Sequence, residues 1–269
     1  MTNPETNRSF LLRTVGVRTL QASVWLTAAL LLLCSVVVAR AQYGTVSELD
    51  AAITNAFGTM GCAPTAVVNS FVYLDNNFGA TLLPDAGSDQ DVLNLGAFMA
   101  TSAAGGTTAA GWVTGKWDWV QEYDPAVTMT GQDKYGIAYD GMDATPPTWQ
   151  FIENEFTNHE DVEIGIIWPN SIGHVLTLTG CNLDTNGNGT VTFIDPWGGV
   201  ALSGTLMNNN GTLTLNYIGG GAGNPPGNTG TITMVTAESI PEPSSAILVC
   251  WAGLMICSVC RFRSRGSGN

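Results

Sequence analysis

Apolar residues recur at helical spacing in the first half of the chain and at alternate positions in the second half. Ala63, Val67, Phe71, Leu74 and Phe78 follow one another at spacings of three and four residues, which predicts an amphipathic helix. The same spacing predicts helices over residues 43–57, 91–99 and 147–159. From residue 162 the period is two, which predicts strands over residues 164–168, 174–178, 191–195, 202–206, 213–217 and 231–235. We therefore expect an α+β fold in which a helical part packs on an antiparallel sheet.

One segment, over residues 112–127, is unusually aromatic for its length. It contains Trp112, Trp117, Trp119 and Tyr123. Side chains of this kind form core contacts in most proteins, and in some they line a substrate groove. The sequence leaves both interpretations open.

The N-terminal segment has the organisation of a secretory signal. Three arginines within the first 18 residues precede an apolar run over residues 24–38, and Ala39-Arg40-Ala41 follows just before Gln42. An uncleaved membrane anchor is the alternative, but the apolar run is short for a membrane span. We expect signal peptidase to remove residues 1–41.

The C-terminal segment carries a second targeting pattern. Pro241-Glu242-Pro243 is followed by an uncharged stretch over residues 246–260 and by three arginines within residues 261–265. Residues 239–265 closely resemble the PEP-CTERM sorting signal of Gram-negative bacteria, which an exosortase recognises and cuts. The resemblance implies transient insertion into the inner membrane, followed by residence at the cell surface or in the extracellular matrix. A plain tail anchor is the alternative.

Charge excludes some partners. With both ends set aside, only Lys116 and Lys134 remain basic, whereas all but two of the 22 acidic residues remain. A body this acidic repels nucleic acid and anionic lipid, so neither is an expected partner. The sequence shows no phosphate loop and no zinc-ligand cluster, and we expect no cofactor.

The strongest candidate for chemistry is Cys62. Gly61 precedes it. Pro64 suits the first turn of a helix because an N–H group in that turn has no acceptor within the helix, so its absence in proline costs no hydrogen bond. Cys62 is therefore expected at a helix N-terminus, where unpaired N–H groups and the helix dipole favour the nucleophilic thiolate. His174 and Asp195 follow in the order that nucleophilic acyl transfer requires, as base and as orienting carboxylate.

These motifs resemble those of the papain-like cysteine peptidases. Gly61-Cys62-Ala63-Pro64-Thr65, Gly173-His174 and Asp195-Pro196 are most similar to the branch that includes the peptidases of double-glycine leaders. The resemblance implies a papain-like domain over residues 42–238, with Cys62 on its helical part and with His174 and Asp195 on its sheet. It also implies a peptide or protein substrate.

The chain departs from that family at the oxyanion position. The family carries Gln six residues before the nucleophile, where this chain has Ala56. Asn55 can take the place of the family Gln as an oxyanion donor only if the loop before Cys62 is one residue longer than in the family. Otherwise backbone N–H groups alone stabilise the oxyanion.

Cys181 offers a structural alternative, a disulfide with Cys62. However, Cys181 lies seven residues beyond His174, about 23 Å along a strand at ~3.3 Å per residue. A contact between Cys62 and His174 therefore disfavours the disulfide. His159 is expected to be a solvated residue near a helix end rather than a catalytic one.

The connection between the strands of His174 and Asp195 contains a weak calcium candidate. Asp184, Asn186 and Asn188 present oxygens at alternate positions, as the start of a calcium loop does, although a Gly-rich turn is the default interpretation. For His174 to lie opposite Asp195, the hairpin must be centred near Asp184, which predicts a wide loop.

Taken together, the sequence predicts an exported thiol hydrolase, most simply a cysteine peptidase. The alternative is a catalytically inactive domain of the same fold that binds partners at the cell surface or in the extracellular matrix.

Overall fold

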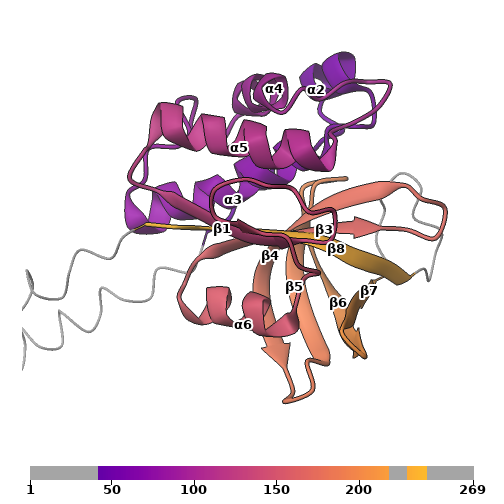
Figure 1. The fold of residues 1–269 in the computed structure, drawn as a ribbon. Helices are drawn as coiled ribbons and strands as arrows, with labels where there is room; N and C mark the ends of the chain where they lie inside the picture. The colour runs from indigo at the N-terminus through magenta and orange to yellow at the C-terminus, as the bar shows by residue number, and fades with distance from the viewer. Residues whose placement is uncertain (1–41, 218–228, 241–269) are drawn as a thin grey trace, which may run out of the picture. The chain divides into compact units, whose positions relative to one another are not determined.

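The computed structural model describes residues 42–217 and 229–240 (Figure 1). The predicted secretory signal and the sorting signal from Pro241 onward lie outside these residues. Within them, no helix combines the length and the apolar character needed to cross a membrane. The helices are α2 (Ala51–Phe57), α3 (Cys62–Phe78), α4 (Asp89–Phe98), α5 (Ala109–Tyr123) and α6 (Trp149–Thr157). The strands are β1 (Thr128–Asp133), β2 (Met142–Asp143), β3 (Asp161–Ile167), β4 (Gly173–Leu183), β5 (Gly189–Asp195), β6 (Val200–Asn209), β7 (Thr212–Asn216) and β8 (Thr229–Ser239).

Six strands, β3 to β8, close into an antiparallel barrel (Figure 1). Each strand from β3 to β7 pairs with the next one, and β8 closes the barrel because it pairs with both β7 and β3. Residues 229–231 of β8 pair with β7, and residues 234–239 pair with β1. The short strand β2 extends the sheet beyond β1.

Apolar side chains from the barrel strands form one of two cores. Alternate residues of a strand point to opposite faces, so Leu176 and Leu178 of β4 pack with Val191 and Phe193 of β5. Ile152 of α6 belongs to the same cluster, so α6 covers part of the barrel.

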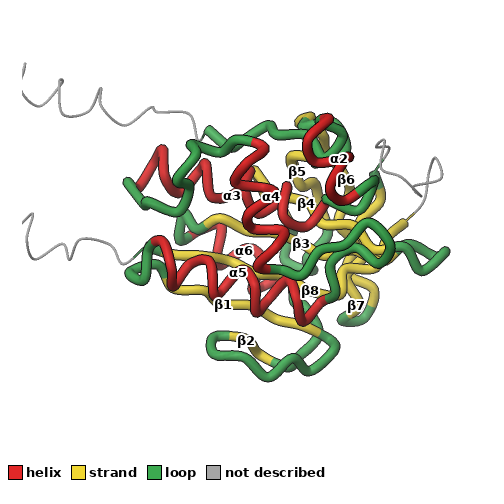
Figure 2. The backbone as a smooth tube through the Cα atoms, turned by 90° about the horizontal axis from the view of Figure 1, so that it is seen from above, coloured by secondary structure: helices red, strands yellow, loops and turns green. Residues whose placement is uncertain are grey.

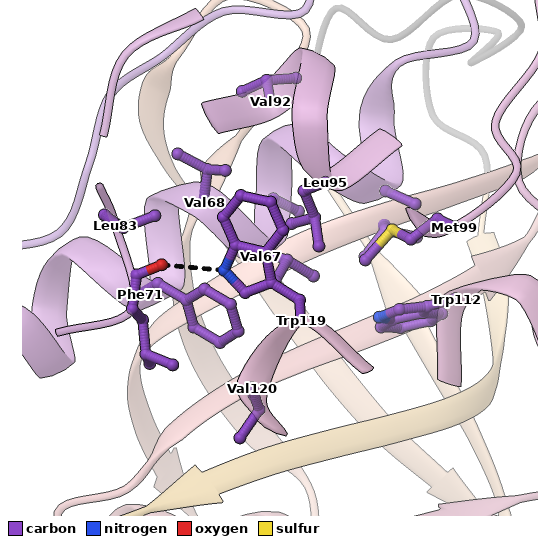
Figure 3. Packing of buried hydrophobic residues seen from close by; sticks show 14 of the residues in the cluster. Val67, Val68, Phe71, Leu83, Val92, Leu95, Met99, Trp112, Trp119 and Val120 are labelled. Atoms are coloured by element: carbon purple, nitrogen blue, oxygen red, sulfur yellow. Dashed lines mark hydrogen bonds between the residues drawn. The ribbon is translucent and has the colours of Figure 1, made fainter. Parts of the chain in front are cut away.

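The other core lies between α2–α5 and the strands, on the side opposite α6 (Figures 1 and 2). Trp119 of α5 lies at its centre, where it packs near Val68 and Phe71 of α3 (Figure 3). Its indole N–H is also satisfied, because Nε1 donates to the Leu82 carbonyl at 2.8 Å (Figure 3).

Two buried side-chain hydrogen bonds hold α3 on the barrel. The Thr177 hydroxyl of β4 donates to the Ala66 carbonyl, and the Ser70 hydroxyl donates to Asp161 of β3 at 2.9 Å. Since neither bond can be replaced by water in this buried region, the two together fix the helix along β3 and β4.

A buried ionic cluster links α5 to the barrel. Lys116 forms ion pairs with Glu163 and Glu238, and all three side chains are fully buried. Asp161 lies in the same cluster. Burial raises the pKa of Asp161 to about 7, an effect that Glu163 increases and Lys116 opposes. Burial also raises the pKa of Glu238. One cation therefore compensates three carboxyl groups.

The predicted fold class, a papain-like helical part on an antiparallel sheet, is wrong. The strands form a closed six-stranded barrel with two additional strands instead of an open sheet. Period-two patterns identify strands and their buried faces but do not specify which edges pair. Barrel closure depends on the contact between β7 and β8, which the patterns could not reveal.

Most individual elements were predicted correctly, but strands β1 and β2 were not predicted, and two helices differ from the prediction. The aromatic segment is largely helical as α5, although no helix was predicted there. The first helix begins at Ala51 rather than near Tyr43, because the preceding backbone pairs with the Asn69 side chain of α3. The helix after Cys62 and the hairpin of β6 and β7 are confirmed.

We expect Lys116→Met to destabilise the protein strongly and in a pH-dependent manner. Removing one partner of a buried ion pair costs about 3–5 kcal/mol of the free energy of unfolding. The loss should be larger at pH 8.5 than at pH 5.5. In the folded state the raised carboxyl pKa values favour protonation. The stability that the protonated carboxyl groups contribute is therefore present at acid pH and is lost as pH rises through about 7.

Urea unfolding of the parent and of the variant at both pH values measures this. Lys134→Met is the matched control, because Lys134 is exposed and should change stability by less than about 0.5 kcal/mol. Equal stability of the two lysine variants at pH 8.5 would show that the cluster is not held by Lys116.

Candidate active site

Cys62 is the first residue of α3, where the sequence predicted it. The helix cap at Gly61 makes no side-chain hydrogen bond to the first turn. A side chain at Gly61 would also be blocked, because its Cβ would lie 2.8 Å from Ile53. The N–H groups of Cys62 and Ala63 in the first turn of α3 have no acceptor within the helix, because only later residues of a helix find a carbonyl one turn back.

His174 and Asp195 form a buried pair behind Cys62. His174 is the second residue of β4, Asp195 is the last residue of β5, and His174 Nε2 lies 2.9 Å from Asp195 Oδ1. The same Asp195 oxygen accepts the Trp197 N–H at 2.9 Å, so the carboxylate is held by the turn that follows β5.

The predicted register between these two strands is wrong in detail. Thr177 pairs with Ile194, and the last pair before the turn is Leu183 with Gly189, so the turn is tight and no wide loop is needed. Continuing this register makes His174 a diagonal neighbour of Asp195 on the same face. Diagonal neighbours in a sheet remain within reach of long or aromatic side chains, which explains the contact.

Electrostatics favour a protonated His174. Burial alone lowers the pKa of its imidazole, but hydrogen bonds to Asp195 and Cys62 and their charges outweigh burial and raise it to about 10. Because Nε2 faces Asp195, Nδ1 is the nitrogen available to Cys62. A positively charged imidazole beside a thiol stabilises the thiolate, the nucleophilic form.

Cys62 and His174 border a cavity of about 310 Å³. Its walls come from the loop over residues 104–107, from Trp112 of α5, from β3 and β8 and from the loop before His174. Apart from the reacting pair Cys62 and His174, the lining residues carry no charged side chain. The space beside the thiol therefore suits an uncharged group.

Trp112 fits both interpretations of the aromatic segment. It is buried in the helical core, and it also borders the cavity beside Cys62. Trp119 belongs to the helical core and does not line the cavity. His159, as expected, is exposed and lies away from the cavity, with its carbonyl accepting the Tyr73 hydroxyl at 3.0 Å.

Asn55 and Ala56 are exposed on α2 and do not line the cavity. The structure thus gives Asn55 no contact with the cavity beside Cys62. Backbone N–H groups at the start of α3 are the donors that the geometry offers to a developing oxyanion.

The calcium candidate residues form a capped turn. Asp184 Oδ1 accepts the N–H groups of Asn186 at 2.8 Å and Asn188 at 2.9 Å. These hydrogen bonds lower the pKa of Asp184. Asn188 Oδ1 accepts the Asn208 N–H at 2.9 Å. The oxygens therefore already have roles within the turn, and calcium binding stays an untested prediction.

Two residues near the site were not identified from the sequence. Glu48 is buried and interacts electrostatically with His174 and Asp195, and the Tyr217 hydroxyl is buried near Asp195. Burial, followed by the charge of Asp195, raises the pKa of Tyr217. Both residues lie outside the recognised motifs, and only the folded chain brings them to Asp195.

Comparison with known proteins adds no assignment, since no known protein family matches the chain and no curated protein matches it significantly.

We expect iodoacetamide to alkylate Cys62 at least about tenfold faster than Cys181 near pH 7. Both are free thiols in the structure. Burial and the charge of Glu153 raise the pKa of Cys181 to about 11, so only roughly one molecule in ten thousand carries its thiolate at pH 7. Peptide mapping after timed labelling separates these two from the other four cysteines of the chain.

Cys181→Ser is the control and should leave the Cys62 rate unchanged, whereas His174→Gln should lower it. A disulfide between Cys62 and Cys181 on non-reducing mapping, or equal labelling rates, would contradict the expected activation.

Proposed function

We propose that this protein is an exported thiol hydrolase, most simply a cysteine peptidase. The observation that carries the proposal is the arrangement of Cys62 and the buried residues His174 and Asp195 in one hydrogen-bonded series beside a cavity. A nucleophile, a base and a group that orients the base are the requirements of covalent acyl transfer.

The reaction follows from the order of the three groups in this series. The Cys62 thiolate attacks the carbonyl carbon of a peptide bond, and N–H groups at the start of α3 stabilise the oxyanion. His174 donates its proton to the leaving amine as the C–N bond breaks, which leaves a thioester on Cys62. Water then attacks the thioester and His174 accepts the proton of that water; the C–S bond breaks, which releases the acid product and restores the Cys62 thiolate.

Asp195 supports both steps without exchanging protons with the substrate. Its Oδ1 fixes the orientation of the imidazole through Nε2 and stabilises the positive charge on His174. Its second contact, from the Trp197 N–H, keeps the carboxylate aligned. The uncharged cavity beside Cys62 favours an apolar or small polar group of the substrate over a charged one.

We expect three substitutions to impair turnover to different extents. Cys62→Ala should abolish peptide hydrolysis, because the nucleophile is lost. His174→Ala should lower kcat/KM by about 10²–10⁴-fold, since general acid and base catalysis contribute this much. Asp195→Asn should lower it by roughly 10–100-fold, because an amide still orients the ring but stabilises the imidazolium less. The three effects should not be additive, since the residues act as one unit.

Hydrolysis of a broad peptide library by the purified protein measures this, with Cys181→Ser, His159→Ala and Asp140→Asn as matched controls. Activity that survives Cys62→Ala would reject the proposed nucleophile. An inactive parent would favour a binding protein at the cell surface or in the matrix.

The proposal also includes processing at both ends. We expect the protein recovered from its native host to begin at Gln42 and to lack the arginine cluster of residues 261–265, because the two ends carry the patterns that signal peptidase and an exosortase recognise. Intact-mass measurement tests this, and retention of either segment on the exported protein would contradict it. A variant with Pro241-Glu242-Pro243 replaced by alanines is the control that should keep its C-terminus.

A further inference from the structure

The segment that precedes α2 is fixed against the catalytic residues from two sides. Asn69 of α3 clamps Val46, since its Oδ1 accepts the Val46 N–H at 2.8 Å and its Nδ2 donates to the Val46 carbonyl at 3.0 Å. Two residues later, the Glu48 N–H donates to the Pro196 carbonyl at 2.8 Å. The segment over residues 46–48 is thus attached both to the helix that begins at Cys62, through Val46, and to the turn that follows Asp195, through Glu48.

This attachment carries the Glu48 carboxyl group into the site. Glu48 is 1% exposed, and its charge interacts with those of His174 and Asp195. Within the part of the chain that the structure describes, its Oε2 has no hydrogen-bond partner. The same is true of Asp195 Oδ2 and of the Tyr217 hydroxyl. Three buried polar atoms without partners therefore belong to groups that interact electrostatically with one another around Asp195.

We propose that Glu48 is a positioning residue that controls the charge of His174 through its own ionisation. The inference rests on the proposed hydrolase function, and it adds a regulatory carboxyl to that site. A protonated Glu48 is neutral and can donate a hydrogen bond within the cluster. An ionised Glu48 places a second negative charge beside the imidazole and stabilises its protonated form.

The charged and titratable groups around Glu48 come from several elements. His174 lies on β4, Asp195 ends β5, Tyr217 follows β7 and Cys62 begins α3. Burial raises the pKa of Glu48 to about 7, His174 opposes this rise and Asp195 adds to it. Glu48 is therefore neutral below about pH 7 and ionised above it. Ionisation in this range keeps His174 protonated to a higher pH than Asp195 would achieve alone.

The test is the imidazole titration of Glu48→Gln, followed by NMR in the full-length protein. The chain has only two histidines, so His159, which is exposed, provides an internal reference. We expect the titration midpoint of His174 to fall by about half a pH unit or more, because glutamine cannot ionise. The His159 midpoint should not move. Glu122→Gln, at an exposed position, is the matched control and should change neither midpoint.

An unchanged His174 midpoint in a folded Glu48→Gln variant would overturn the inference. If that variant does not fold, the carboxyl titration of Glu48 itself provides the test in the parent and in His174→Gln. Loss of the imidazolium removes the charge that opposes the raised pKa, so the Glu48 midpoint should rise. An unchanged Glu48 midpoint would overturn the inference equally.

Neither titration requires a substrate, so failure of this inference and failure of the proposed function are distinguishable. A shifted His174 midpoint without peptide hydrolysis would retain the coupling and reject the hydrolase. Peptide hydrolysis with an unshifted His174 midpoint would retain the hydrolase and reject the coupling. In an active enzyme, Glu48→Gln should also shift the alkaline limit of the kcat/KM profile downward, which a purely structural role would not do.

Discussion

The docking of α3 on β3 and β4 is the constraint on which the rest of the structure depends. Thr177 and Ser70 form buried hydrogen bonds across this contact, and a shift of the helix by one turn would leave both groups unpaired. Because α3 cannot slide, its first residue has a fixed position relative to β4. That position brings Cys62 to His174, although the two residues are more than a hundred positions apart in the chain.

Barrel closure supplies the second half of the site. A strand paired on both edges resists slipping in register, because a slip would move its apolar side chains out of the core. The diagonal relation of His174 and Asp195 is therefore a property of the whole barrel. Asp195 also accepts the Trp197 N–H, so the turn after β5 supports the same carboxylate. The imidazole is held by rigid strands on one side and meets the helix on the other.

Two clusters of buried charge, around Lys116 and around His174, have opposite consequences. Around Lys116, three carboxyl groups share one cation, and burial makes protonation favourable there. Around His174, two acidic partners outweigh burial and favour the protonated imidazole. Glu48 combines both situations, since it is a buried carboxyl group that also interacts with the positive charge of His174. Buried carboxyl groups such as Asp161 and Glu48 therefore have pKa values raised to about 7, in a chain whose body carries few cations to compensate them.

The sequence alone determined the local features of the chain. Helical spacing after Cys62 predicted α3, and the Gly61 and Pro64 positions predicted that the thiol would lie at its start. Alternation predicted the strands that carry His174 and Asp195, because each signal depends only on neighbouring residues.

Tertiary structure decided the rest. Closure of the barrel depends on β8 pairing with β7 as well as β3, and no local pattern encodes the choice of strand edges. Helix α5 was missed because its tryptophans and glycines weaken the periodic pattern, whereas packing around Trp119 compensates for them. Glu48 reaches the site only because Asn69 and Pro196 hold a segment without regular secondary structure beside it. Spacing along the chain carries no information about such contacts, since they join residues that only the folded backbone brings together.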